Sequence, residues 1–219
     1  MKAEFTPVPK DWSRQPYFDY YWNKIESKYS LNYQLEITAM FAEIKKRKLR
    51  FYPTMIYLIM RVINQNEEFR LSFNSNKQLG IWNFCNPSYT IFNEEDKSFS
   101  DIWTPYHSSY SAFYAAATED MERYKGIKQI KAKPNQPANF TPISCLPWLS
   151  YSSLSLTSSP DSTLLYPLIQ FGKFYLENEK QLMPFSVFVN HAIADGYHVA
   201  KLINEVEELC QNPSQWINS

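Results

Sequence analysis

The stretch FSVFVNHAIADGYH, residues 185–198, combines side chains that could do chemistry: two of the chain's three histidines and an aspartate within eight positions. An imidazole titrates near neutral pH, so His191 is a candidate general base, with Asp195 as a nearby acid to orient it. On a continuous helix, His191, Asp195 and His198 would share one face and could bind zinc. His191 could also be a hydrogen-bonded core histidine. Spacing alone leaves all three interpretations open.

The elements around these residues decide how they are presented. The apolar, β-branched run before His191 predicts a buried strand over 181–190 that ends at Asn190. Gly196 then allows a turn into a helix over 197–210, whose apolar residues recur on one face. A strand, a turn and a helix would break the continuous helical face that the zinc hypothesis needs. No further cluster of metal ligands is visible, so we predict no metal.

The rest of the chain mixes strands and helices without regular βαβ alternation, which favours an α/β two-layer sandwich with a largely antiparallel or mixed sheet and helices on one face. The length suits a single domain over 1–219. Strands are predicted at 31–40, 79–84, 88–92, 143–156 and 164–175, and helices at 41–48, from Pro53 through 68, and at 111–126, closed by Gly126.

Composition excludes several classes of function. The 22 basic and 22 acidic side chains balance, which argues against nucleic acid or an anionic membrane as partner. Four glycines form no GxGxxG or P-loop. Three widely spaced cysteines fit reduced thiols rather than disulfides or zinc. The N-terminus resembles no signal peptide, and we predict a cytosolic protein.

Within this frame, NHAIADGYH resembles the HHxxxDG signature of coenzyme A-dependent acyltransferases, most closely in its chloramphenicol acetyltransferase form. Similar segments follow in the family's order along nearly the whole chain. The resemblance implies the family's fold, a homotrimer with active sites between subunits, acetyl-CoA as co-substrate and chloramphenicol as acceptor. These segments are DWSRQPYFDYY (11–21), FYPTMIYLIMRVINQNEEFR (51–70), PSYTIF (87–92), FSDIWTPY (99–106), MERYKG (121–126), ISCLPWLSYSSL (143–154) and FGKFY (171–175).

The resemblance also implies roles for single residues. His191 stands at the general base, which would remove a proton from the primary hydroxyl of chloramphenicol as it attacks the thioester. Ser144 matches the serine that donates to the oxyanion. Asp195 matches an acid paired with the arginine of an N-terminal WxR, here Arg14, and Gly196 matches the turn glycine. Asn190 replaces the first histidine of HHxxxDG, which we interpret as a structural change.

The acceptor pocket of the family is lined from the neighbouring subunit by residues that match Tyr20, Tyr21, Ile25, Tyr29, Thr90, Phe99 and Leu154. Trp148, Lys173 and Phe174 match positions facing the coenzyme A tunnel. Gln170 departs from the family's usual threonine near the reacting centre and alters the expected fit of the acceptor. Two alternatives therefore remain: an acetyltransferase for another hydroxyl compound, and a binding or scaffold protein that has lost catalysis.

Overall fold

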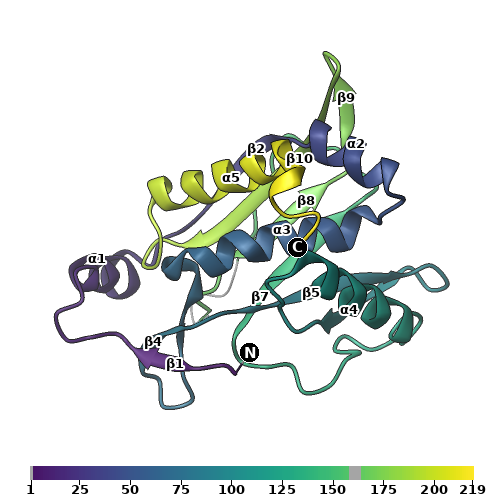
Figure 1. The fold of residues 1–219 in the computed structure, drawn as a ribbon. Coiled ribbons are helices and arrows are strands. Elements are labelled where there is room, and N and C mark those ends of the chain that lie inside the picture. Colours follow the sequence, from purple (N-terminus) through teal and green to yellow (C-terminus); the bar gives the residue numbers. More distant parts are fainter. Residues whose placement is uncertain (1, 158–163) are drawn as a thin grey trace.

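The chain folds around one long mixed sheet, as a computed structural model that describes residues 2–157 and 164–219 shows (Figure 1). Its path runs β2-β10-β8-β7-β5-β6, and β9 (Tyr175–Glu177) pairs with β10 beside that path. β7 is parallel to both β5 and β8, and the other pairs are antiparallel. The six strands of the path are β2 (Lys28–Glu36), β10 (Lys180–Asn190), β8 (Leu168–Gly172), β7 (Phe140–Leu146), β5 (Asn86–Asn93) and β6 (Ser98–Trp103).

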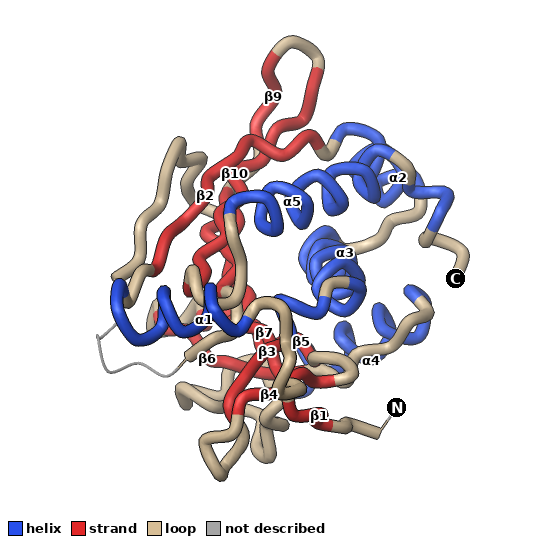
Figure 2. Tube along the Cα trace, turned by 90° about the vertical axis from the view of Figure 1, so that its left-hand side faces the viewer, coloured by secondary structure: helices blue, strands red, loops and turns tan. Residues whose placement is uncertain are grey.

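Four helices cover one face of this sheet (Figure 2). They are α2 (Thr38–Lys46), α3 (Phe51–Gln65), α4 (Tyr110–Arg123) and α5 (Gly196–Gln211). α3 lies at the centre of the layer, and its residues from Pro53 to Met60 are all buried. A helix that is apolar on every side belongs in such a central position, since each face meets protein.

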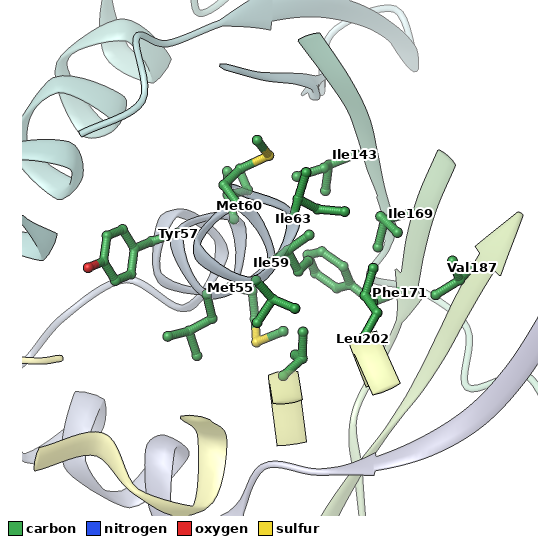
Figure 3. Close-up of a cluster of buried hydrophobic side chains, with 14 of the residues drawn as sticks. Met55, Tyr57, Ile59, Met60, Ile63, Ile143, Ile169, Phe171, Val187 and Leu202 are labelled. Atoms are coloured by element: carbon green, nitrogen blue, oxygen red, sulfur yellow. The ribbon is translucent and has the colours of Figure 1, made fainter. Parts of the chain in front are cut away.

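The side chains of the sheet alternate between the helix layer and the opposite face. Figure 3 shows Ile143, Ile169 and Val187 of three adjacent strands beside α3. Their neighbours Ser144, Gln170 and Ser186 therefore face away from the helices, and the strand register places these three side by side. The fold thus builds a polar row across the face that the four helices leave uncovered.

The remaining elements lie at the ends of the main sheet. A second, three-stranded sheet has the order β1-β4-β3. A short helix near the N-terminus continues directly into a π-helical turn, which leads into β2. These elements are β1 (Phe5–Pro7), β4 (Leu79–Trp82), β3 (Leu71–Phe73), α1 (Gln15–Tyr20), η1 (Tyr21–Ile25), η2 (Glu67–Arg70) and η3 (Pro213–Gln215).

The predicted fold class is confirmed, as are the strand over 181–190 and the helix over 197–210. Two predicted strands were too long. The segment 31–40 leaves the sheet after Glu36. Its last three residues begin α2, where Met40 is buried. The segment 143–156 ends as a strand at Leu146, where Pro147 has no backbone N–H for a ladder.

Several boundaries also moved. α4 ends at Arg123, and Gly126 takes its positive φ of 79° in the turn that follows rather than closing the helix. The segment 164–175 forms the shorter β8 and the start of β9. In the described ranges, no helix is both long enough and apolar enough to cross a membrane.

Candidate active site

His191 lies on a tight turn between the end of β10 and the start of α5. Its backbone N–H donates to the carbonyl of Ser27 at 2.9 Å, which ties the turn to the entry of β2. Asn190 is buried, and its side-chain oxygen accepts from the backbone N–H of Ala192 at 2.9 Å. This local bond closes the turn.

Two tyrosines enclose the imidazole of His191. Tyr21 stacks on it almost parallel, with ring centroids 3.7 Å apart and planes 9° apart. Tyr29 approaches at 5.1 Å and donates its hydroxyl to the carbonyl of Ala194 at 3.1 Å. Burial, and then the nearby Asp195 carboxylate, raise the pKa of Tyr29 to about 12, so the phenol stays protonated. The ring of His191 is thereby held in one orientation with a quarter of its side chain exposed.

Arg14 and Asp195 form the predicted clamp. The guanidinium donates to both carboxylate oxygens, at 2.7 and 2.9 Å. This bidentate geometry gives strong, charge-assisted hydrogen bonds. The hydrogen bonds from Arg14 hold the pKa of Asp195 below its ordinary value, although burial acts in the opposite direction. The pair joins the N-terminal segment to the turn that carries His191.

Removing Arg14 is expected to destabilise the protein. The side chains of Arg14 and Asp195 remain 16% and 34% exposed, so the loss should stay below that of a fully buried pair. We expect Arg14→Ala to lower the free energy of unfolding by about 1.5 to 3 kcal/mol in a denaturant titration. Arg123→Ala removes an exposed pair with Glu119 and should change it by less than about 0.5 kcal/mol. Equal losses in the two variants would contradict a special role for the clamp.

The same clamp predicts a pH dependence. Because the folded-state pKa of Asp195 is lowered, the pair stabilises the protein fully above the unfolded pKa of about 4 and loses its effect as the pH falls below it. The difference in unfolding free energy between the wild type and Arg14→Ala should thus be constant near neutral pH and shrink below about pH 4. Denaturant titrations at several pH values measure it. A difference that grows on acidification would refute this assignment.

His198 and Gly196 have smaller roles. His198 Nδ1 accepts from the backbone N–H of Asp195 at 3.1 Å and so caps the first turn of α5. Since α5 begins at Gly196, the helical face proposed for zinc does not form. Within residues 2–157 and 164–219, no three histidine, cysteine, aspartate or glutamate side chains are grouped to hold a metal. A Cβ added at Gly196 would have no described neighbour within 4 Å, so close packing within the chain does not require a glycine here.

A second group of predicted residues meets at a fork in the sheet. The parallel pairing of β5 with β7 ends at Tyr89 and Ile143. Beyond that point β5 continues only with β6, and β7 only with β8. Thr90 and Ser144 are the first residues after the split, and their hydroxyl oxygens are 3.4 Å apart. Tyr52 of α3 donates its phenol to the carbonyl of Thr90 at 2.8 Å.

The fork opens into a cavity of about 660 Å³. The strand alternation places part of its lining on the helix side of the sheet and part on the open face, so the cavity passes through the sheet. Two positive side chains, Arg50 and Lys125, line the helix side, and a third, Lys97, lies over the ring of Phe92 at 5.9 Å. Lining residues on the helix side are Arg50, Phe51, Tyr52, Ile91, Met121, Glu122, Lys125 and Cys145, and those on the open face are Thr90, Phe92, Phe99 and Ser144, with Trp148 just beyond β7.

His191 and Ser144 do not meet within one chain. Ser186 pairs with Gln170 across β10 and β8, and Gln170 pairs with Ser144 across β8 and β7. His191 lies five residues past Ser186 along the chain. With about 3.3 Å per residue and 4.8 Å between strands, the Cα atoms of His191 and Ser144 are about 19 Å apart. A direct hydrogen bond spans about 3 Å, so His191 and Ser144 lie in two separate groups of residues, called half-sites below.

The other predicted residues divide between these half-sites. Tyr20 packs edge-on against Tyr21 near His191, and Ile25 ends the same π-helical turn, half exposed. Thr90, Phe99 and Trp148 lie in the cavity with Ser144. Leu154 lies instead beside β2, where its backbone N–H donates to Asn32. The acceptor residues predicted from the sequence therefore do not form one pocket in a single chain.

The predicted coenzyme A residues are also spread out. Phe174 packs against Phe51, which lines the cavity, with ring centroids 5.4 Å apart. Lys173 is exposed, and its backbone N–H donates to Leu149. Gln170 is buried beside Ser144 in the polar row. The contact of Tyr52 was not predictable, because nothing in the spacing around Pro53 indicates that this phenol would donate to the backbone carbonyl of Thr90 in the sheet.

The chain is similar to known proteins over nearly its whole length. The family model described as "Chloramphenicol acetyltransferase" matches residues 4–207. The chloramphenicol acetyltransferases of Clostridium perfringens and Clostridium butyricum are 39% and 40% identical over 208 residues, which is 95% of each chain. A solved chloramphenicol acetyltransferase superposes with a TM-score of 0.88 at 20% identity, over 94% of this chain and 100% of its own.

A more distant structure shares the fold. The dihydrolipoamide acetyltransferase of Azotobacter vinelandii superposes with a TM-score of 0.69 at 14% identity, over 97% of this chain and 93% of its own. At such identities the structures support the fold, whereas the family model and the two clostridial relatives extend over nearly the whole chain. The resemblance inferred from NHAIADGYH is confirmed, and this chain belongs to the chloramphenicol acetyltransferase family.

Proposed function

We propose that the protein transfers acetyl from acetyl-CoA directly to the primary hydroxyl of chloramphenicol, in the cytosol, as a homotrimer that inactivates the antibiotic. The observation that carries this proposal is the cavity that passes through the sheet beside Ser144. One end offers cations to an anionic co-substrate, and the other opens on the face where a second chain could bring His191. Family membership supplies the chemistry of the two substrates.

His191 would act as the general base through Nε2. Its Nδ1 is buried, lies 3.4 Å from Asp195 Oδ1 and has no hydrogen-bond partner among the described residues. The negative carboxylate favours the proton on Nδ1, which leaves the lone pair of Nε2 free to accept. Nε2 takes the proton of the hydroxyl as its oxygen bonds to the thioester carbon. When the carbon–sulfur bond then breaks, the imidazolium gives this proton to the departing thiolate of coenzyme A. Such assistance contributes typically about 10² to 10⁴ in rate.

Ser144 would donate to the oxyanion that forms on the thioester carbon. It lies at the fork, where the cavity reaches the open face. A well-placed donor of this kind contributes roughly 2.7 to 4 kcal/mol to the stability of the transition state. Cys145, the next residue, is no rival nucleophile, because burial raises the pKa of its thiol to about 12. At neutral pH only about one thiol in 10⁵ would be ionised, which supports direct transfer without an acyl-enzyme.

Arg50 and Lys125 would guide coenzyme A to the helix side of the cavity. Arg50 pairs with Glu122 at 2.8 Å, whereas Lys125 has no ion pair with any described residue. Phe51 and its neighbour Phe174 offer apolar surface at the same end, and Trp148 lies toward the open face. The acceptor would then bind between Phe99 and the tyrosines beside His191 of another chain, with Leu154, Ile25 and Tyr20 at its edge.

The function is tested by thiol release from acetyl-CoA with and without chloramphenicol, together with mass analysis of the product. Chloramphenicol-dependent release of one thiol for each acetylated product supports the proposal. Gln170, buried beside Ser144, favours a second candidate, in which another hydroxyl compound is the acceptor. A panel of alcohols and other antibiotics distinguishes the two. Coenzyme A binding without transfer to any acceptor would indicate a scaffold protein instead.

A further inference from the structure

The hydroxyl of Ser144 has a single neighbour that can set its direction. Within the described part of the chain, Thr90 Oγ1, at 3.4 Å, is the only hydrogen-bond partner of Ser144 Oγ. A hydroxyl carries one hydrogen and two lone pairs. If Ser144 donates to Thr90, its hydrogen is used and no longer available to an oxyanion. If Thr90 donates, the hydrogen of Ser144 is free to point into the cavity.

The position of Thr90 is fixed from two sides. Thr90 follows the last residue of β5 that pairs with β7. Its carbonyl accepts a hydrogen bond from the phenol of Tyr52 at 2.8 Å. Burial raises the pKa of Tyr52 well above its ordinary value, so this phenol stays protonated and remains a donor. The preceding residue, Tyr89, is fully buried and shares a 2.7 Å hydrogen bond with Thr104. Thr90 is thus held at the fork with its side chain beside Ser144.

We propose that Thr90 is a positioning residue: its hydroxyl donates to Ser144 Oγ and thereby directs the hydrogen of Ser144 toward the oxyanion. The hydrogen of Thr90 has no other acceptor among the described side chains, since Ser144 is its only partner. As negative charge develops on the substrate, the chain from Thr90 through Ser144 to the oxyanion becomes more polarised. The distance of 3.4 Å would shorten in that state, as catalytic hydrogen bonds commonly do.

This inference rests on the proposed function, and a four-protein comparison tests it. The proteins are the wild type, Thr90→Val, Ser144→Ala and the double variant, assayed for kcat and for both KM values. Valine keeps the shape and the β-branch of threonine but has no hydroxyl. We expect Thr90→Val to lower kcat roughly five- to tenfold, as the loss of one hydrogen bond implies, with both KM values unchanged. In the Ser144→Ala background the same change should have no further effect.

Thr90→Ser supplies the matched control, because it restores the hydroxyl and should restore kcat to within about twofold of the wild type. Thermal unfolding checks that each variant is folded. An equal loss in both backgrounds, or a change confined to the KM of chloramphenicol, would overturn the inference while leaving the acetyl transfer intact. Absence of transfer by the wild type to chloramphenicol or to any tested alcohol would overturn the proposed function and this inference together.

Discussion

Replacing His191 with alanine is expected to lower kcat by about 10² to 10⁴, while the KM for acetyl-CoA stays close to that of the wild type. The imidazole would move a proton between the acceptor hydroxyl and the departing sulfur of coenzyme A, and it is not among the residues that line the cavity with its cations. Its loss therefore removes proton transfer in the transition state but leaves the binding of the co-substrate unchanged. Steady-state kinetics with each substrate varied in turn separates the two effects.

Two further variants make this result interpretable. His107→Ala removes the third histidine, which is exposed on the loop before α4, and should leave kcat unchanged. His191→Gln keeps a polar side chain of similar size against Tyr21, so it tests whether loss of packing explains the effect. If His191→Gln retained most of the wild-type kcat, proton abstraction by this side chain would be refuted.

The half-site around His191 was largely predictable because its parts are local or share a motif. Adjacent residues form the strand before His191, the turn and the helix that follows. The hydrophobic pattern changes from that of a strand to that of a helix at the turn. The pairing of Arg14 with Asp195, 181 residues apart, was expected from the family resemblance, and the structure contains it as one bidentate pair of two hydrogen bonds. No property of Arg14 itself distinguishes it from a surface arginine.

The half-site around Ser144 was less predictable because it depends on strand pairing across the sheet. Thr90 and Ser144 are neighbours because the β5–β7 register, which pairs Tyr89 with Ile143, brings the next two residues together at the point where the ladder ends. Such an ending arises from tertiary packing and has no local sequence signal. The stacking of Tyr21 on His191 has the same origin, since a π-helical turn that propensity does not predict presents the ring.

The separation of the two half-sites predicts that inactive variants will complement each other. His191 and Ser144 are about 19 Å apart in one chain by strand geometry, so under the proposed function a working site takes His191 from one subunit and Ser144 from its neighbour. His191→Ala still carries an intact Ser144, and Ser144→Ala still carries an intact His191. Mixed oligomers of the two therefore contain some interfaces with both groups present.

Each variant alone should be nearly inactive, and an equal mixture, denatured and refolded together, should regain about a quarter of the wild-type activity. At each interface one chain must supply His191 and the other must supply Ser144. In an equal mixture, each of these two positions holds the suitable variant in about half of the cases, so about a quarter of the interfaces are complete. Thiol release with chloramphenicol gives the activity of the whole refolded mixture. Different affinity tags on the two variants then allow the mixed oligomers to be isolated, and these should carry all of that activity.

The matched control mixes His191→Ala with the double variant His191→Ala/Ser144→Ala, which offers no intact base and should regain nothing. Recovery in the first mixture alone would show that the site joins two chains. If isolated mixed oligomers of the two single variants stayed inactive, the base and the oxyanion donor would have to act within one chain. They could do so only if the strands between them rearranged, because β8 and the full register of Ser186, Gln170 and Ser144 lie between the two half-sites.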